Sequence, residues 1–460
     1  MSIATNAETA SSHQAQLGRS LRSRHVQMIA IGGIIGAGLF VGSSTTIATA
    51  GPAVIITYAI SGLMVLMIMR MLSEMAMTAP GTGSFTEFVR LGLGHGAGFV
   101  AGWLYWYFWV VVVPVEAIAG AVIVRQWLPQ FEVWQLGTFL LALMTGVNLL
   151  STRSYGEVEF WLSSLKVGAI IVFILLAGAW AFGFTSPAGP TFANLTAHGG
   201  FAPAGYAAVL AAVTSVIFSV VGAEISTIAA AESNEPAKTI AQAATSVALR
   251  ILLFYILSIG LIVCVLPWNS IVPGESPFTA VLVMMKIPFA GTAMSLIVLV
   301  AVLSCLNSSL YVTSRVLFVL AAKGDAPKWL VAVTGRQVPA RSILVGSVFG
   351  YFALAASVLS PKMVFSFLVN SSGATMLIIY FMVCAAQIRH RYMVDAVAPE
   401  RLVLRMWWFP YASYLTAGAI LAVLIAMAFK HDLMVQLVTS LAVAALVWLA
   451  YVVFRRGRLA

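Results

Sequence analysis

Four glycines interrupt an apolar segment near the start of the chain. Residues 28–42 read MIAIGGIIGAGLFVG and include Gly32, Gly33, Gly36 and Gly38. Because each glycine in a helix interior costs about 1 kcal/mol relative to alanine, this segment is predicted to be a broken helix. A helix that restarts near Gly38 directs its free amides and positive dipole end toward the break, and this arrangement suits a carboxylate.

A second interruption lies in residues 218–232, FSVVGAEISTIAAAE, where Gly222 and Glu224 break an apolar run. Helices that end near Ile34 and Val221 would offer unpaired carbonyls, and these suit an ammonium group. Unwound backbone at membrane depth survives only where it is buried or lines a polar cavity. Two such breaks that share a central site could therefore bind both ends of a zwitterionic amino acid through the main chain alone.

Side chains around the two breaks would select the rest of the ligand. We expect Trp109, Phe218 and Gly222 to line this pocket. The pattern Gly32-x-x-x-Gly36 also fits close packing between membrane helices, and this alternative stays open. A nucleotide-binding loop is not indicated, because GIIGAG follows no strand and precedes no soluble domain.

Three ionisable residues lie deep within predicted membrane helices: Glu116, Lys166 and Glu224. Each costs about 2.5 to 3.5 kcal/mol at the membrane centre, so all three are expected to face the bundle interior. Our hypothesis is proton symport in which Lys166 is a coupling element, Glu224 is a gate or relay, and Glu116 belongs to the same coupling and gating set. A structural role, in which Lys166 only ties two helices together through backbone carbonyls, is the alternative.

Elsewhere, Arg70 and Glu74 are four residues apart and are expected to form a structural ion pair.

The composition defines the class of protein that holds these groups. The 460 residues are 61% hydrophobic and 9% charged, with a mean hydropathy of +0.99, and these values exclude a soluble globular protein. At about 20 apolar residues per spanning helix, about twelve membrane helices are predicted. They cover residues 27–50, 53–78, 97–127, 134–150, 157–182, 206–231, 240–267, 290–322, 341–359, 363–387, 410–429 and 433–454.

The distribution of basic residues orients these helices. With the N-terminus inside, the outer loops hold few of the Lys and Arg residues: Arg125, Lys286, Lys362 and Lys430. The positive-inside rule accounts for this asymmetry and for the net charge of +10 without a nucleic-acid partner. Residues 1–24 are polar and lack the apolar region of a signal peptide, so we expect a disordered cytoplasmic tail there. Residues 455–460 are expected to form the C-terminal cytoplasmic tail.

The order of the spans also predicts internal symmetry. If spans 1–5 (residues 25–182) and spans 6–10 (residues 206–387) share a fold, each unit has an odd number of helices. The second unit must then enter the membrane from the side opposite the first, which makes an inverted repeat. Residues 410–454 would supply two further spans.

Other classes of membrane protein are not favoured. None of the six histidines pairs with an acidic or cysteine residue at metal-ligand spacing inside a span, so no membrane enzyme, metal or cofactor is indicated. No Walker A motif is present for an ATP-driven pump, and a channel normally needs a filter built by oligomerisation. The cysteines Cys264, Cys305 and Cys384 lack CxxC spacing and are interpreted as packing residues.

Five stretches together resemble bacterial amino acid permeases of the amino acid/polyamine/organocation superfamily. They are GGIIGAGLFVGSS, GPAVIITYAISGLMVLMIMRMLSEMA, GTGSFTEFVRLGLGHGAGFVAGWLYW, FSVVGAEISTIAAAES and SCLNSSLYVTSRVLFVLAAKGDAPK. The resemblance runs from about Leu21 to Met406, and LFVGSS, GWLYWYFWV, GAEISTIAAAES and SRVLFVLAAKGDAP are most similar to 4-aminobutyrate (GABA) permeases. It implies an all-α integral membrane protein with the LeuT-type five-plus-five inverted repeat, broken helices 1 and 6, and spans 11 and 12 appended.

The resemblance also implies a binding site. Carried over residue by residue, the carboxylate site falls on the amides of Gly36, Ala37 and Gly38, and the amine site on the carbonyls near Ile34, Phe218 and Val221. Lys166 resembles the family's span-5 lysine, which lies where sodium-coupled relatives hold a second cation. Some relatives have a hydroxyl residue where this sequence has Ala37, so carboxylate recognition here would rest on backbone amides.

These arguments predict a secondary active transporter of the bacterial inner membrane. It would import 4-aminobutyrate or a related ω-amino acid with protons by alternating access, so its partners are a small zwitterionic amino acid, protons and the lipid bilayer. A standard α-amino acid, aromatic or proline, is the alternative substrate, because backbone recognition of a carboxylate and an amine does not fix their separation. A transporter-like nutrient sensor is the alternative function.

Overall fold

The computed structural model describes residues 34–79, 85–150, 152–222, 224–225, 251–336, 338–429 and 431–457. Within these ranges the regular elements are all helices, and no β-strand occurs. Several sequence predictions concern residues outside the description: the tail 1–24, Gly32 and Gly33, the second half of span 6 and the start of span 7.

The helices of the first half of the chain are η1 (Gly38–Gly42), α2 (Ser43–Ala50), α3 (Val54–Thr78), α4 (Phe85–Leu93), α5 (His95–Val124), α6 (Val133–Leu150), α7 (Thr152–Ala181), α8 (Tyr206–Ala211) and α9 (Val213–Val220). Those of the second half are η4 (Ile251–Leu257), α12 (Ser258–Val265), α13 (Pro277–Met284), α14 (Ala290–Ala322), α15 (Ala340–Ala356), α16 (Pro361–Val397), α17 (Tyr411–Ala428) and α18 (His431–Gly457). Short 3-10 turns connect several of them.

Eight stretches of the described residues are long and apolar enough to cross a membrane. One of them, Gly38–Thr78, has 41 residues, which is about twice the length that one crossing needs. Gly51 divides it, because its φ of 62° ends α2 before α3 begins. Three shorter apolar helices also occur, Tyr206–Val220, Phe254–Val265 and Ala340–Ala356. The chain is therefore a multi-pass membrane protein, while the count of twelve spans stays a prediction.

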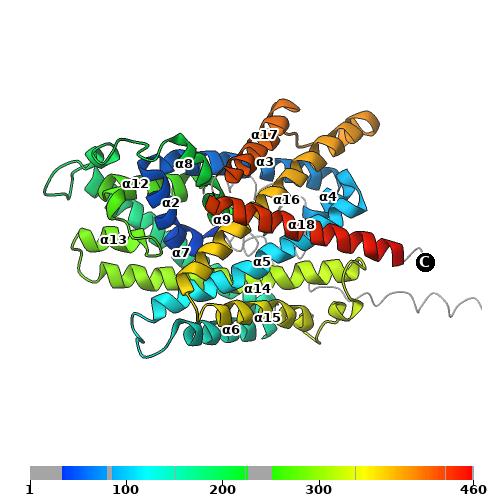
Figure 1. The fold of residues 1–460 in the computed structure, drawn as a ribbon, viewed down its shortest axis with the longest axis horizontal. Helices are drawn as coiled ribbons and strands as arrows, with labels where there is room; N and C mark the ends of the chain where they lie inside the picture. The colour runs from blue at the N-terminus through cyan, green and yellow to red at the C-terminus, as the bar shows by residue number, and fades with distance from the viewer. Residues whose placement is uncertain are drawn as a thin grey trace, which may run out of the picture.

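Two long helices, α5 and α14, form the centre of the molecule. They lie side by side in Figure 1, with α6 and α15 packed along one side of them and α16 along the other. α5 is apolar on all faces, and 83% of its membrane-spanning window is buried within the protein. The windows of α17 and α18 are only 28% and 17% buried, so these two helices lie at the periphery. The interrupted elements η1 and α9 pack against each other, and α9 also packs against α3 and α16.

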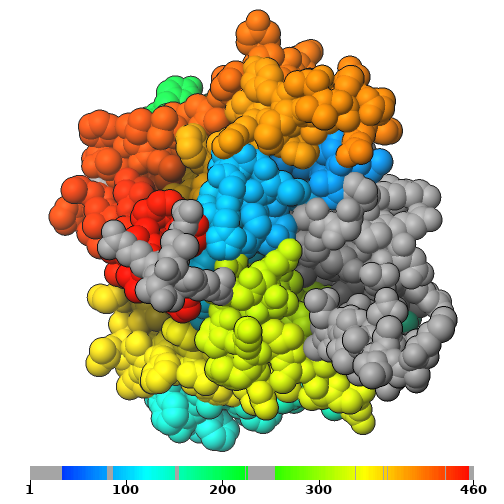
Figure 2. Space-filling view, turned by 90° about the vertical axis from the view of Figure 1, so that its right-hand side faces the viewer, coloured from blue at the N-terminus to red at the C-terminus, as the bar shows by residue number. Residues whose placement is uncertain are grey.

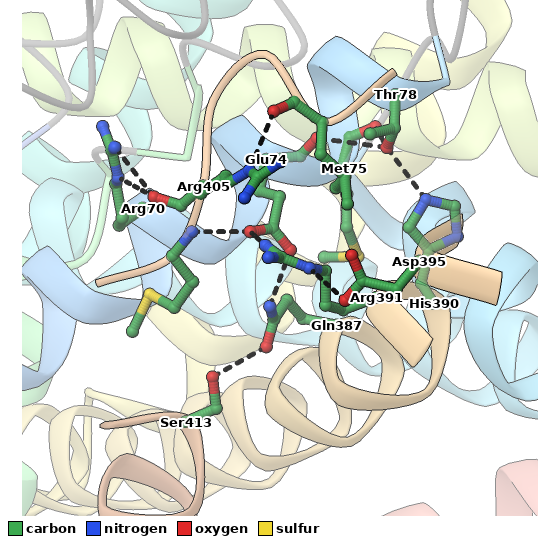
Figure 3. A network of polar contacts seen from close by, with 12 residues as sticks. Arg70, Glu74, Met75, Thr78, Gln387, His390, Arg391, Asp395, Arg405 and Ser413 are labelled. Atoms are coloured by element: carbon green, nitrogen blue, oxygen red, sulfur yellow. Dashed lines mark hydrogen bonds and ion pairs between the residues drawn. The ribbon is translucent and has the colours of Figure 1, made fainter. Parts of the chain in front are cut away.

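A buried network around Glu74 ties α3 to α16 and α17 (Figure 3). The fully buried Glu74 carboxylate forms an ion pair with Arg391 at 2.6 Å and accepts a hydrogen bond from Gln387 at 2.8 Å. Gln387 in turn accepts a hydrogen bond from the Ser413 hydroxyl of α17 at 2.8 Å. Arg391 also pairs with Asp395, whose side chain is 40% exposed. The network joins three helices that are far apart in the sequence.

The expected ion pair between Arg70 and Glu74 does not form. Arg70 instead donates two hydrogen bonds to the backbone carbonyl of Arg405, at 2.8 and 3.0 Å (Figure 3). The reason is burial, since Glu74 faces α16 where water is excluded and needs a counter-ion there, which Arg391 supplies. Arg70 is half-buried and is satisfied by a backbone carbonyl.

A cluster of charges joins α4 and α5 to the segment after α14. The buried Asp325 side chain pairs with Arg90 and with His95, the latter at 3.2 Å. Glu87 of α4 pairs with Lys323 at 3.2 Å. Figure 2 shows the end of α14 (yellow-green) lying against the start of α5 (light blue) on this face. The cluster holds the short helix α4 against the ends of the two central helices.

Candidate functional site

The first interruption lies immediately before η1. Ile34 is helical, Ile35 and Gly36 form a bend, and the helix restarts at Ala37 as a π-helical turn, Gly38–Gly42, that leads into α2. π-Helical turns are rare and are frequent at functional sites. The restart near Gly38 that the glycine pattern predicts is therefore confirmed, although the residues before Ile34 lie outside the described part of the chain.

The second interruption follows α9. The helix ends at Val220, Val221 is extended, with φ −65° and ψ 148°, and Gly222 has a φ of 123° that favours glycine. Glu224 and Ile225 follow the turn. The predicted break at Gly222 is thus confirmed for the residues that the structure describes.

The two interruptions meet. The Ser219 hydroxyl at the end of α9 donates a hydrogen bond to the carbonyl of Gly38 at 2.8 Å. A Cβ placed on Gly38 would lie 2.7 Å from the Ser219 Cα, and a Cβ on Gly36 would lie 2.7 Å from the Cys305 Sγ of α14. Such distances are shorter than real side chains tolerate, so both positions need glycine for the close approach.

A small cavity lies where the breaks meet. Its lining consists of Ile34, Gly36, Gly38, Phe108, Trp109, Val112, Glu116, Phe218, Ser219, Val221 and Cys305. The predicted wall residues Trp109 and Phe218 are among them, whereas Gly222 is not, because the backbone turns away at Val221. The enclosed space is about the size of one water molecule, so an amino acid enters only if the surrounding groups move. The Trp109 Nε1 is buried and has no hydrogen-bond partner among the described residues.

A carboxylate already occupies one of the predicted amides. Glu116 of α5 is buried beside the cavity, and its two oxygens accept hydrogen bonds from the Ala37 N–H at 3.1 and 3.2 Å. The geometry demonstrates that this amide faces a carboxylate in the interior of the protein. Glu116 was placed by sequence in a coupling and gating set, and its position at the restart of the helix was not foreseen.

One hydroxyl group faces two of the backbone carbonyls at the interruptions. The Tyr255 hydroxyl, in η4, lies 2.7 Å from the carbonyl oxygen of Ile34 and 2.7 Å from that of Ser219. It therefore bridges the two interruptions. One phenol carries a single proton, so it can make only one full-strength hydrogen bond at a time. The carbonyl of Ile34, one of the predicted amine ligands, thus faces a donor.

Lys166 of α7 lies on the other side of the first interruption. Its ammonium donates hydrogen bonds to the carbonyl of Ile35 at 3.2 Å and to the Ser304 hydroxyl of α14 at 2.8 Å. It also forms an ion pair with Glu159 of α7 at 3.7 Å, and neither side chain has any exposed surface. Lys166 thus contacts one backbone carbonyl of span 1, which is the contact that the structural alternative predicts, and Glu159 is an additional partner.

Glu224 lies beyond the second interruption and does not line the cavity. Its carboxylate accepts hydrogen bonds from the Tyr105 hydroxyl of α5 at 3.3 Å and from the Tyr380 hydroxyl of α16 at 3.2 Å. The Gly222 N–H donates to the same carboxylate at 3.1 Å. Glu224 therefore fixes the turn at Gly222 and links it to two other helices.

The residues that sequence reasoning missed include two polar partners of the interrupted segment and of Lys166, Tyr255 and Glu159. Glu159 lies seven residues before Lys166, a spacing that places both on one face of a helix, and this signal was available. Tyr255 is an uncharged aromatic residue in an apolar run, and no local pattern distinguishes it. Within the described ranges, no three His, Cys, Asp or Glu side chains gather as a metal ion would require.

Comparisons with known proteins show what this chain resembles. The sequence pattern of the family described as Amino acid permease matches residues 25–459. The gamma-aminobutyric acid permease of Bacillus subtilis strain 168 is 43% identical over 446 residues, which cover 97% of this chain and 95% of the relative. The gamma-aminobutyric acid permease of Escherichia coli K12 is 42% identical over 434 residues, which cover 94% and 92%.

A solved structure shares the overall fold. The manganese transporter of Eremococcus coleocola, crystallised with an aromatic bis-isothiourea substituted compound, aligns over 95% of each chain with a TM-score of 0.56. The sequence identity is 13%, so this likeness concerns the fold alone.

Proposed function

The chain belongs to the amino acid permease family, and on that basis we propose that it imports 4-aminobutyrate, or a related ω-amino acid, together with protons by alternating access. Two relatives that span nearly the whole chain and are named gamma-aminobutyric acid permeases support this choice of substrate. The protein is a carrier in this proposal and not an enzyme.

The proposal rests on the cavity where the two interrupted helices meet. There the protein's own Glu116 carboxylate accepts from the Ala37 amide, and the protein's own Tyr255 hydroxyl faces the Ile34 carbonyl. Each of these groups stands where one end of a zwitterionic substrate is expected. The substrate carboxylate binds the amides of Gly36, Ala37 and Gly38, and its ammonium group binds the carbonyls of Ile34, Phe218 and Val221.

The helices are organised as a LeuT-type inverted repeat in this proposal. Residues 25–182 form the first unit, residues 206–387 form the second, and residues 410–454 add two peripheral spans. The low burial of α17 and α18 supports their peripheral role. The protein lies in the bacterial inner membrane with both termini in the cytoplasm, as the asymmetry of the basic residues favours.

Proton coupling involves the three buried ionisable groups next to the breaks. Lys166 holds the Ile35 carbonyl, Glu116 holds the Ala37 amide, and Glu224 holds the Gly222 amide. A change in the protonation of any of them alters a hydrogen bond to an interrupted backbone segment. Proton binding can therefore be linked to the opening and closing of the cavity.

A standard α-amino acid with an aromatic side chain is the second candidate substrate. The observation that favours it is the aromatic wall of the cavity, formed by Phe108, Trp109 and Phe218. The small size of the enclosed space favours the smaller ω-amino acid, because less of the surroundings must move.

Uptake in proteoliposomes tests the proposal. Purified protein should accumulate radiolabelled 4-aminobutyrate above its equilibrium level when a proton gradient is imposed, and a protonophore should abolish the accumulation. Protein-free liposomes treated in the same way are the control. Unlabelled phenylalanine and proline should compete poorly.

Three results would contradict this proposal in different ways. Strong accumulation of phenylalanine with little 4-aminobutyrate would favour the second substrate. Binding of 4-aminobutyrate without any flux would favour a sensor. Accumulation that persists with the protonophore would rule out proton coupling.

A further inference from the structure

Lys166 shares a buried polar site with Glu159, two helical turns earlier on α7. Both side chains have no exposed surface, and their charged atoms lie 3.7 Å apart. A buried charge without a partner is strongly destabilising, and a buried pair is retained only if hydrogen bonds satisfy it. Glu159 is the acidic group in ion-pair contact with Lys166 among the described residues.

The Ser304 hydroxyl of α14 connects the two groups. Lys166 donates to the Ser304 Oγ at 2.8 Å, and the Ser304 hydroxyl donates to the Glu159 Oε1 through a short hydrogen bond. The Ser163 hydroxyl also donates to Oε1, at 3.0 Å. The second oxygen, Oε2, is buried and has no hydrogen-bond partner among the described residues. The carboxylate thus has one crowded oxygen and one unoccupied oxygen.

We propose that Glu159 is the proton acceptor of Lys166, with Ser304 as the relay between them; this inference rests on the proton coupling proposed above. The Lys166 ammonium passes a proton to the Ser304 Oγ as Ser304 passes its own proton to the Glu159 Oε1. The N–H bond of Lys166 breaks, the O–H bond of Glu159 forms, and Ser304 is unchanged. The charged pair becomes an amine and a carboxylic acid, and no other reactant is needed.

This transfer changes the hold on the first interruption. An ammonium donates a charge-assisted hydrogen bond to the Ile35 carbonyl, and such bonds are roughly twice as strong as bonds from a neutral donor. A neutral Lys166 therefore holds Ile35 less tightly. Ile35 lies between Ile34 and Gly36, which both line the cavity. Proton transfer to Glu159 thus weakens a hydrogen bond to Ile35, the residue between two that line the cavity.

Polar groups extend from Glu159 toward the ends of α7 and α14. Asn307 lies beside the Glu159 carboxylate and accepts a hydrogen bond from Asn148 of α6 at 2.7 Å. One turn farther along, the Tyr155 hydroxyl of α7 lies 3.0 Å from the Ser308 hydroxyl of α14. These pairs continue the line of buried polar groups beyond Glu159.

Two other titratable groups face Lys166 from neighbouring helices, Glu116 of α5 and Cys305 of α14. Glu116 is held by the Ala37 amide. For Glu159, by contrast, a continuous hydrogen-bonded path through Ser304 leads to Lys166.

The Glu159→Gln variant tests the inference, because glutamine keeps the shape and the hydrogen bonds of the side chain but cannot take the proton. We expect proton-driven accumulation of 4-aminobutyrate to fall by about tenfold, within the range that is typical for coupling between sites. Exchange of labelled for unlabelled 4-aminobutyrate needs no net proton movement. Its rate should therefore stay within about twofold of the wild-type rate. A pH-sensitive dye inside the liposomes should report loss of substrate-induced proton entry. The control is Glu400→Gln, an exposed acid outside the membrane helices.

Two outcomes overturn the inference. Wild-type accumulation and proton entry in Glu159→Gln would exclude Glu159 as the acceptor, and equal loss of exchange and accumulation in a folded variant would assign it a structural role. If Glu159→Gln does not fold, Ser304→Ala decides, because it removes only the relay hydroxyl and should show the same split. Failure of the proposed function would appear differently, as a wild-type protein that moves no protons with the substrate.

Discussion

The contact between Glu116 and the Ala37 amide sets a condition on substrate binding. A substrate carboxylate that approaches this amide meets the negative charge of Glu116 at close range. Two like charges 4 Å apart repel each other by about 4 kcal/mol at an effective dielectric constant near 20. In the proposed binding mode, the substrate would therefore bind best when Glu116 is protonated or has moved away, so proton and substrate would favour each other at this residue.

Glu116→Gln should remove this competition. We expect the apparent KM for 4-aminobutyrate at alkaline pH to fall by about tenfold, less than the full repulsion would give because the surroundings relax. The KM of the wild type should fall as the pH is lowered and Glu116 takes up a proton, whereas the KM of the variant should be low at every pH. Counterflow measurements across the pH range provide these values.

The matched control for this experiment is Glu132→Gln, because Glu132 is exposed and pairs only with Arg125 among the described residues. A variant at Glu116 with an unchanged or higher KM at alkaline pH would mean that the substrate carboxylate binds elsewhere.

Residues could be located from the sequence where their cost in a membrane marked them. Glu116, Lys166 and Glu224 were identified because a charge in an apolar helix needs a reason, and each contacts an interrupted segment. Glu159 was overlooked because it lies near the start of its predicted span, where a charge reads as interfacial. Tyr255 could not be found, since its role depends on where two distant carbonyls meet in space.

At the scale of the helices, the separation between η1 and α9 depends on Gly38. Gly38→Ala would place a Cβ 2.7 Å from the Ser219 Cα, which belongs to backbone and cannot yield without a shift of the helix. Such overpacking typically costs about 1–3 kcal/mol. The overpacking would push η1 and α9 apart. We expect the initial rate of uptake to fall by about tenfold or more if a cost of this size falls on the transporting conformation.

Gly42→Ala is the matched control, one turn along the same helix. A Cβ there would meet nothing closer than 3.7 Å, which is ordinary contact, so uptake should stay near the wild-type level. Both rates are to be normalised to the amount of protein in the membrane. Equal rates in the two variants would refute the claim that the close approach at Gly38 matters for transport.

The positions of both interruptions could be predicted because a glycine cluster, or a glycine next to an acidic residue as at Gly222 and Glu224, is unusual in an apolar helix. The π-helical form of η1 could not be predicted, since no local pattern in this segment distinguishes a π-helical turn from an α-helical one. The ion pair of Glu74 was predicted with Arg70 from local spacing, but burial against α16 selected Arg391, 317 positions away. Local patterns therefore locate a break or a charge, and only the packed structure assigns the partner.

At the scale of the molecule, the Glu74 network joins α3 to the late helices α16 and α17. Glu74→Ala would leave Arg391 buried without its main counter-ion, and breaking such a pair costs about 3–5 kcal/mol. We expect a marked fall in the midpoint of thermal unfolding in detergent. The same Arg391 also pairs with Asp395, but that side chain is 40% exposed, so Asp395→Ala should cost at most about 1 kcal/mol. An equal effect of the two substitutions would show that burial does not decide the strength of this contact.

The single hydroxyl of Tyr255 has a wider consequence. Two carbonyl oxygens lie within reach of one proton, so this hydroxyl can satisfy only one of them at a time. In the proposed binding mode, a substrate ammonium group would bring three donors to the same place. Two carbonyls compete for one hydroxyl proton in the empty protein, and a bound substrate would end this competition. The hydrogen bonding of the Tyr255 hydroxyl would therefore differ between the empty protein and the protein with bound substrate.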